Sequence, residues 1–281
     1  MAIVSNKPAN LRLVETAAEA PAQRPRVVLV IPAYNEEKNI ENVLIEIQKL
    51  SQSKPEWEII PIIVNDGSTD QTELTLNRLS DKYSFRAINL PVNLGIGGAV
   101  QAGFRYAVSL NPDVVLQLDG DGQHPPHEIP KIVTPILDDN ADVVVGSRYV
   151  AGAGGVVSSH LRHFGTSCFS MLLKLLVRVK ITDATSGFRA FSIDASDFIA
   201  RCYPDDYPEV QAYVPLARSG FSIQEVAVNM RPRVGGTSSI TALRSFYYMI
   251  KVAFATMVDV VRTLPLRRHL KREGKRGSLA G

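Results

Sequence analysis

The sequence is poor in cysteine and has no long apolar run at its N-terminus. Only two cysteines, Cys168 and Cys202, occur in 281 residues. This excludes a disulfide framework and a cysteine-based metal site, and it makes a reducing compartment the default expectation. Residues 1–26 are rich in Ala, Pro and polar residues and have no continuous apolar core. That composition excludes a signal peptide or membrane span there, and we expect a disordered leader.

A strong excess of one charge is also missing. The formal net charge of +3 is too small by itself to indicate nucleic acid, and we expect no nucleic-acid partner. With 45% hydrophobic and 21% charged residues among 281, the chain can bury a sizeable core, most simply in one large α/β domain. Basic residues are concentrated only near the C-terminal end.

Apolar runs and helical patterns alternate from Val27 onward. We expect strands at Val27–Ile31, Ile59–Val64, Phe85–Leu90, Val114–Leu118 and Ala141–Val145, and helices around Ile40–Ile47, Thr72–Leu79 and Gly98–Leu110. Asn35 is interpreted as the N-cap of the first helix. The alternation predicts an α/β fold with a doubly wound, mostly parallel sheet, whose ligands bind at the carboxyl ends of the strands. Asn35, Asp66 and Asp119 all follow such ends.

Asp119 and Asp121 are separated only by Gly120 and follow a buried strand. Two carboxylates this close repel each other unless a cation lies between them. Oxygen ligands suit hard Mg²⁺ or Mn²⁺, whose coordination is completed by substrate phosphates and water. Alone, the pair is equally typical of a surface Asp-Gly turn. His124 and His127 do not favour zinc, because no cysteine is nearby and prolines separate them.

A series of motifs then carries a family resemblance. The motifs are Pro32-Ala-Tyr-Asn-Glu-Glu37, Asn65-Asp-Gly-Ser-Thr-Asp70, Asn93-Leu-Gly95, Asp119-Gly-Asp-Gly-Gln-His-Pro125, Gly146-Ser-Arg148 and Thr185-Ser-Gly-Phe-Arg189. In this order they resemble the family-two glycosyltransferases, in the branch of dolichol-phosphate mannose synthase and bacterial polyprenyl-phosphate glycosyltransferases. The resemblance implies a nucleotide-diphospho-sugar transferase fold of the glycosyltransferase-A type, over residues 27–239.

The resemblance also implies a donor site. Pro32, Tyr34, Glu36 and Asp66 would bind the nucleoside, although Tyr34 and Asp66 are equally typical of packing and helix capping. The matching DxD motif implies that Asp119, Gly120 and Asp121, helped by Gln123, hold Mn²⁺ or Mg²⁺ and the diphosphate. Arg233 matches a family arginine that reaches the diphosphate. Asn65 and Ser239 depart from the family pattern, which leaves the choice between UDP and GDP and a second cationic contact open.

The acceptor implied by the resemblance is a polyprenyl phosphate. Arg148 and Arg162 match arginines that bind the lipid phosphate, and guanidinium groups suit that role. A phosphate monoester is already nucleophilic near pH 7, so we expect in-line displacement with inversion at the anomeric carbon. Asp183 is a candidate base or orienting residue, and capping a turn is an equal alternative.

Other functions stay open at this point. The same fold could transfer a sugar to a soluble or glycan acceptor, or the chain could be a non-catalytic nucleotide-sugar-binding protein. A processive membrane synthase is disfavoured because the Gln-x-x-Arg-Trp motif of such enzymes is absent and Trp57 is the only tryptophan. Gly95-Ile-Gly-Gly98 has the wrong spacing for a dinucleotide-binding motif, and we interpret it as a loop beneath the donor.

The last expectation concerns a membrane surface. Residues 167–179 predict an apolar helix too short to span a bilayer. In residues 240–281 we expect an amphipathic helix at Ala242–Leu264 and a basic tail containing Arg267, Arg268, Lys271, Arg272, Lys275 and Arg276. Such a segment favours peripheral binding to anionic lipid, at the cytoplasmic inner face of a membrane. A core helix, a homo-oligomer interface, a membrane-protein partner and a solubilising tail are the alternatives.

Overall fold

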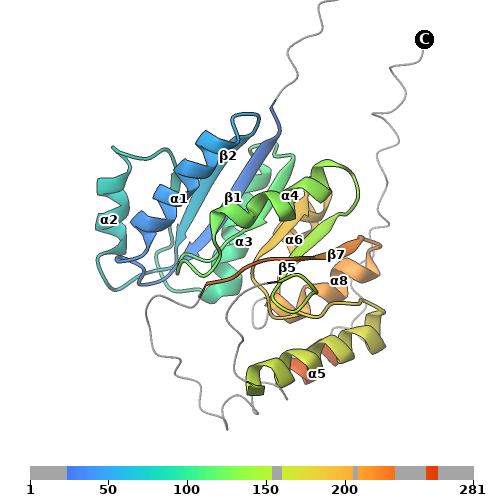
Figure 1. The fold of residues 1–281 in the computed structure, drawn as a ribbon. Coiled ribbons are helices and arrows are strands. Elements are labelled where there is room, and N and C mark those ends of the chain that lie inside the picture. Colours follow the sequence, from blue (N-terminus) through green and yellow to red (C-terminus); the bar gives the residue numbers. More distant parts are fainter. Residues whose placement is uncertain (1–23, 154–159, 205–207, 232–250, 259–281) are drawn as a thin grey trace, which may run out of the picture.

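The computed structural model describes residues 24–153, 160–204, 208–231 and 251–258, with only the backbone for 160–164 (Figure 1). The elements follow one another along the chain as listed here: β1 (Arg26–Ala33), α1 (Ile40–Ser53), β2 (Glu58–Asn65), α2 (Thr72–Leu79), β3 (Arg86–Asn89), α3 (Gly95–Val108), β4 (Val114–Gln117), the 3-10 turn η1 (Pro126–Glu128), α4 (Ile129–Leu137), β5 (Val143–Ser147), α5 (His160–Val177), β6 (Arg189–Ser192), α6 (Ile193–Cys202), α7 (Pro208–Gln211), α8 (Tyr213–Arg218) and β7 (Ile223–Ala227). Residues 251–258 form a further helix.

A seven-stranded sheet forms the centre of the molecule, in the order β3-β2-β1-β4-β6-β5-β7. All pairs are parallel except those that β6 makes with β4 and β5. The central strands β1 and β4 are buried on both faces, which is why their sequences are continuous apolar runs. The expected α/β, mostly parallel fold is confirmed.

Helices cover both faces of the sheet, as Figure 1 shows. Alternate residues of β1 point to opposite faces. Val28 and Val30 join a core cluster with side chains of α3, α5, α6 and α8, whereas Leu29 and Ile31 join one with α1, α2 and α4. The carboxyl ends of β1, β2 and β4 therefore meet at one edge of a rigid three-layer scaffold.

Several local expectations were wrong. Asn35 does not cap the first helix: α1 begins at Ile40, and Asn35 has a left-handed φ of 58°. The glycines Gly95–Gly98 form the first turn of α3 instead of a loop. The strands β6 and β7 were not expected, because segments of only four and five residues carry little alternation signal.

The expected domain boundaries are described only in part. The sheet runs from Arg26 to Ala227, inside the predicted 27–239 domain except for one residue. Residues 1–23 of the predicted leader, and most of the predicted segment 240–281, lie outside the described residues. Within that segment, residues 251–258 are helical as expected.

Candidate functional site

A cavity of about 930 Å³ opens at the carboxyl ends of β1, β2 and β4. It is lined by most of the residues expected to bind the donor: Pro32, Tyr34, Glu36, Asp66, Asp119, Gly120 and Asp121. They come from three separate loops that only the parallel sheet brings together. The cavity therefore lies outside the carboxyl ends of the strands, where open α/β sheets bind their ligands.

Side-chain hydrogen bonds tie the loop after β1 to the loop after β2. The Asn35 Oδ1 accepts from the Thr69 backbone N–H at 2.8 Å, and Asn35 N–H donates to the Ser68 hydroxyl at 3.0 Å. Asp70 Oδ1 accepts from both the N–H and the hydroxyl of Thr72. The left-handed backbone of Asn35 thus serves loop-to-loop docking, which explains why it is not a helix cap.

Asp66 is buried and holds a third loop. Its Oδ1 accepts the Leu94 backbone N–H at 2.7 Å, which places the first turn of α3 against the cavity. At Gly67 an added Cβ would come within 2.6 Å of the Asn93 backbone nitrogen, so only glycine allows this approach. Asn65, the departure from the family pattern, does not line the cavity; its amide donates to Asn89 Oδ1 at 3.0 Å.

Asp119 and Asp121 lie on the cavity wall after β4. Asp119 N–H donates to His124 Nδ1 at 3.1 Å, and the His124 ring stacks on Phe188 with ring centroids 4.8 Å apart. His124 therefore supports the loop and has its Nδ1 as an acceptor. Gly187 lies against Asp119, because a Cβ there would come within 3.2 Å of Asp119 Oδ1.

The donor set of this loop fits a hard divalent cation. Asp119 and Asp121 supply carboxylate oxygens, and the Gln123 amide lies 2.5 Å from Asp121 Oδ2 through its Nε2. In the described part of the chain, no group of three or more His, Cys, Asp or Glu side chains is placed to hold a metal ion. Such a cation would thus take its remaining ligands from phosphate and water, as Mg²⁺ and Mn²⁺ commonly do.

Arg148 and Asp183 form a buried ion pair beyond β5. Arg148 Nε and Nη2 donate to the two oxygens of Asp183, each at 2.7 Å. Asp183 is fully buried, and its backbone N–H donates to Glu225 Oε1 at 2.8 Å. Burial alone lowers the pKa of Arg148, but the hydrogen bonds and charge of Asp183 outweigh it, so the pKa is raised. Neither residue lines the cavity at the carboxyl ends of β1, β2 and β4.

The remaining predicted site residues are described less fully. Arg162 belongs to α5, but its side chain lies outside the description. Arg233 and Ser239 lie outside the described residues altogether. Nearby, Arg231 N–H donates to the Gln123 carbonyl at 2.9 Å, so the chain passes the Asp119–Gln123 loop two residues before Arg233.

Sequence reasoning did not identify several residues that the structure places at or beneath the cavity, among them Asp70, Glu209 and Arg189. Asp70 and Glu209 line the cavity. Arg189 is fully buried and hydrogen-bonds to Gln117, two residues before Asp119. The only signal for Arg189 was its place at the end of the Thr185–Arg189 motif, and Glu209 belongs to no recognised motif.

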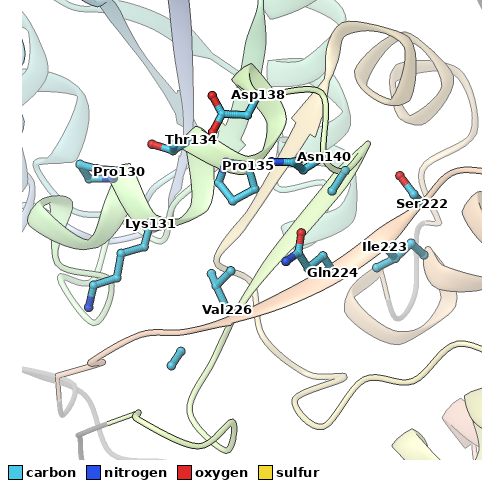
Figure 2. Close-up of a pocket in the computed structure, with 12 residues that line it drawn as sticks. Pro130, Lys131, Thr134, Pro135, Asp138, Asn140, Ser222, Ile223, Gln224 and Val226 are labelled. Carbon is cyan, nitrogen blue, oxygen red and sulfur yellow. The ribbon is translucent and has the colours of Figure 1, made fainter.

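A second hollow of about 1040 Å³ lies between α4 and β7 (Figure 2). Figure 2 shows Lys131, Thr134 and Asp138 on the helix side and Gln224 and Val226 on the strand side. This hollow contains none of the predicted site residues and is a wide surface groove. The carboxylates that follow the strand ends line the first cavity.

Comparison with known proteins agrees with this geometry. The model of the family "Glycosyl transferase family 2" matches residues 28–199, which is more than half of the chain. The chain therefore belongs to glycosyltransferase family 2 and is a sugar-transferring enzyme.

Two curated relatives are similar over most of their length. A UDP-N-acetylglucosamine–dolichyl-phosphate N-acetylglucosaminyltransferase from Methanococcus voltae is 29% identical over 252 residues, covering 83% of this chain and 98% of the relative. An undecaprenyl-phosphate mannosyltransferase from Micrococcus luteus is 30% identical over 224 residues, covering 77% and 92%.

A solved structure shares the fold. It is glucosyl-3-phosphoglycerate synthase from Mycobacterium tuberculosis in complex with Mn²⁺, UDP and phosphoglyceric acid, with a TM-score of 0.60 at 22% identity. The match covers 85% of this chain and 79% of that one. The fold is accordingly of the glycosyltransferase-A type.

Proposed function

We propose that this enzyme transfers a sugar from a nucleotide-diphosphate sugar to a polyprenyl phosphate, with inversion, at the cytoplasmic face of a membrane. The product would serve cell-envelope glycan or glycoprotein synthesis. The observation that carries the proposal is the single cavity that contains Tyr34, Asp66, Asp119 and Asp121. The two relatives named for dolichyl and undecaprenyl phosphate support the choice of acceptor.

The donor would lie along the strand ends. Tyr34 is partly exposed at the cavity and offers a ring for the base, while Glu36 and Asp66 offer oxygens to base and ribose. Asp66 still has Oδ2 for this purpose, since Leu94 uses Oδ1. Uridine and guanosine nucleotides are both compatible with this set.

Mn²⁺ or Mg²⁺ would be held by Asp119 and Asp121, with Gln123 as a further oxygen ligand. When bound, such a cation offsets the negative charge of the departing nucleoside diphosphate. The Gln123 amide donates to Asp121 in the structure, so a role as a ligand requires that amide to turn. Arg233 would add a positive charge on the diphosphate.

The acceptor phosphate is its own nucleophile. It is mostly dianionic near pH 7, so it attacks the anomeric carbon directly as the bond to the diphosphate oxygen breaks. Arg148 and Arg162 would neutralise and position it. Asp183 is fully buried and grips Arg148 through both oxygens, which supports an orienting role for Asp183 more than a role as base.

An exposed apolar surface supports the membrane part of the proposal. On α5, Phe169 and Leu173 face the core while Met171 and Leu175 are exposed. On the helix of residues 251–258, Val252 joins the same core cluster, whereas Phe254 and Met257 point outward. Within the described residues, no helix has both the length and the apolar character needed to cross a bilayer.

One panel tests the proposal. The protein is incubated with Mn²⁺, a set of UDP- and GDP-sugars and either a polyprenyl phosphate or phosphoglycerate, and products are identified by mass spectrometry. A new glycolipid that requires both Mn²⁺ and the polyprenyl phosphate supports the proposal. Transfer only to phosphoglycerate would replace it with a soluble-acceptor function.

Two arginine variants separate the donor from the acceptor. Arg162→Ala is expected to raise the KM for polyprenyl phosphate while nucleotide affinity, measured by calorimetry, stays nearly constant. Arg233→Ala is expected to weaken nucleotide binding. If both variants lose only nucleotide affinity, the acceptor assignment of Arg162 is wrong.

A further inference from the structure

Glu209 is an acid on the donor cavity wall that no recognised motif contains. It belongs to the short helix α7 and lines the same cavity as Asp119 and Asp121. Its side chain is partly buried. In the described part of the chain, no basic side chain forms an ion pair with its carboxylate, although the charge of Arg189 acts on it. An acid held at the cavity wall without an ion pair needs an explanation.

A buried arginine fixes the position of Glu209. Arg189 Nη1 donates to the Glu209 backbone carbonyl at 3.2 Å. Its Nη2 donates to Tyr203 Oη at 2.8 Å and to Gln117 Oε1 at 3.3 Å, and the Tyr203 hydroxyl donates to the same Gln117 oxygen at 3.0 Å. These bonds join β6, β4, Tyr203 at the end of α6, and α7. We call this set the Arg189 cluster.

Burial and charge in the Arg189 cluster are consistent with a structural role beneath the cavity. Burial raises the pKa of Tyr203, so its hydroxyl remains a neutral donor. Burial also raises the pKa of Glu209, and the Arg189 charge opposes that rise. The guanidinium, fully buried, lies over the Phe191 and Tyr213 rings at 5.9 and 5.8 Å. The cluster thus combines fixed geometry with a positive charge beneath an acidic cavity wall.

The strand order indicates which part of a donor Glu209 would meet. Asp66 follows β2, Tyr34 follows β1 and Asp119 follows β4, and these strands are consecutive neighbours in the sheet. The next strand is β6, where Arg189 lies opposite Gln117 of β4. A nucleotide-diphosphate sugar is a linear molecule of nucleoside, diphosphate and sugar. With the nucleoside at β2 and β1 and the diphosphate at β4, the sugar comes next, on the side of β6 and Glu209.

We propose that Glu209 accepts hydrogen bonds from hydroxyl groups of the transferred sugar and is a specificity-determining residue for the donor. This inference rests on the proposed function, because it takes the donor to be a nucleotide-diphosphate sugar. The Arg189 cluster acts as the positioning element that holds α7 against the cavity.

The test compares free nucleotides with nucleotide sugars. Binding of UDP, GDP, UDP-glucose, UDP-N-acetylglucosamine and GDP-mannose, each with Mn²⁺, is measured by calorimetry for the wild type, Glu209→Gln and the control Asp138→Asn from the groove of Figure 2. Glu209→Gln is expected to leave the affinity for the free nucleotide within about twofold. It should weaken the preferred nucleotide sugar by at least about 10-fold, the lower end for a hydrogen bond to a charged group. Asp138→Asn should change neither.

Each other result overturns a different statement. If the wild type binds neither free nucleotide, the proposed function fails. If nucleotides bind and Glu209→Gln leaves sugar binding unchanged, Glu209 does not contact the sugar. If Glu209→Gln weakens free nucleotide equally, Glu209 belongs to the diphosphate site, which also overturns the inference.

Tyr203→Phe tests the positioning element without removing the buried charge. It deletes one hydroxyl of the Arg189 cluster and leaves Arg189 in place. The ratio of nucleotide-sugar to free-nucleotide affinity is expected to fall in the same direction as in Glu209→Gln, by a smaller factor. A lower Tm with an unchanged ratio would mean that the cluster is structural only.

Discussion

The two halves of the enzyme's polar edge are held together in different ways. On the donor side, three loops are fixed by many side-chain bonds to backbone groups, with Asn35, Asp66 and Asp70 each accepting from another loop or turn. On the side of β5, Arg148 and Asp183 form a buried ion pair, and the backbone N–H groups of Thr182 and Asp183 donate to Glu225. The donor side thus depends on several separate hydrogen bonds, whereas the β5 side contains a buried carboxylate that is paired with a largely buried guanidinium.

This difference matches the chemistry expected on each side. On the donor side, carboxylate and amide oxygens accept from backbone N–H groups and so hold the cavity in shape. The remaining oxygens of the cavity wall would bind the hydroxyl groups of the donor and a cation. Both oxygens of Asp183 hold the Arg148 guanidinium, and this pairing would orient it toward the phosphate of the proposed acceptor. Single substitutions should therefore be mild on the donor side, except at the residues that do the chemistry, and severe at the ion pair.

The largest effect is expected at Asp121. Asp121→Ala removes one of the two carboxylates after β4, and losing charge stabilisation of the leaving diphosphate corresponds to several kcal/mol, or at least about 10²-fold in turnover. Sugar transfer is measured with and without Mn²⁺ and EDTA. Asp138→Ala, on α4's end and outside the cavity, is the matched control and should retain normal turnover. Near-normal activity of Asp121→Ala in EDTA would remove the metal from the proposed function.

The largest loss of folding stability is expected for a substitution at Asp183, on the β5 side. Asp183→Ala leaves the Arg148 guanidinium, which is largely buried, without its carboxylate. Removing one partner of a buried ion pair lowers the free energy of unfolding by about 3–5 kcal/mol. Urea unfolding at pH 7 measures it. The double variant Arg148→Ala/Asp183→Ala should be less destabilised than the sum of the single variants, because no uncompensated charge remains. If Asp183→Ala lowers the free energy of unfolding by less than about 1 kcal/mol, the ion pair contributes no more than an exposed one would.

The donor side was largely predictable from the sequence because its signals are local. Continuous apolar runs gave β1, β2 and β4, and the polar residues that follow them are the ones that line the cavity. Parallel strands place such ends at one edge, so sequence positions translate directly into a site. The left-handed turn at Asn35 was missed because an Asn after a strand is equally typical of a cap.

The other side was less predictable because its contacts are long-range. The antiparallel strand β6 is only four residues long, and it pairs with β4 and β5. A segment this short has no sequence periodicity from which its pairing could be predicted. The Arg148–Asp183 bond and the Arg189–Glu209 contact each join residues in separate elements. Arg189 is a buried charge, and composition rules expect arginines on the surface.

A smaller effect is expected where the enzyme would meet a membrane. Phe254 is 68% exposed, and burying a phenylalanine fully in an apolar phase contributes about 1.5–3 kcal/mol. Phe254→Ser should therefore lower binding to anionic liposomes by about 10-fold, measured by flotation. Leu74→Ser is the matched control, since Leu74 is 67% exposed on α2, which packs on the opposite face of the sheet. Equal losses in both variants, or none in either, would argue against this surface as the membrane contact.

The smallest effect is expected at Asp70, because other hydrogen bonds also hold the donor-side loops together. Asp70 accepts from the Thr72 N–H and hydroxyl through Oδ1 and from the Glu37 N–H through Oδ2. Asp70→Asn removes the charge and one of these two acceptor oxygens. Burial raises the pKa of Asp70, but these hydrogen bonds outweigh it, so the pKa is lowered in the folded protein. A lowered folded pKa stabilises the protein above the unfolded value of about 3.9, and the gain is lost as pH falls through the folded pKa.

Urea unfolding should show that Asp70→Asn lowers the free energy of unfolding by about 1 kcal/mol or less at pH 7, with the deficit shrinking toward zero below pH of about 3.9. A deficit that stays constant as pH falls well below that value would mean that Asp70 acts through its hydrogen-bond geometry and not through its charge. A deficit at pH 7 as large as that of Asp183→Ala would mean that the donor loops also depend on a single contact, and the contrast between the two sides would fail.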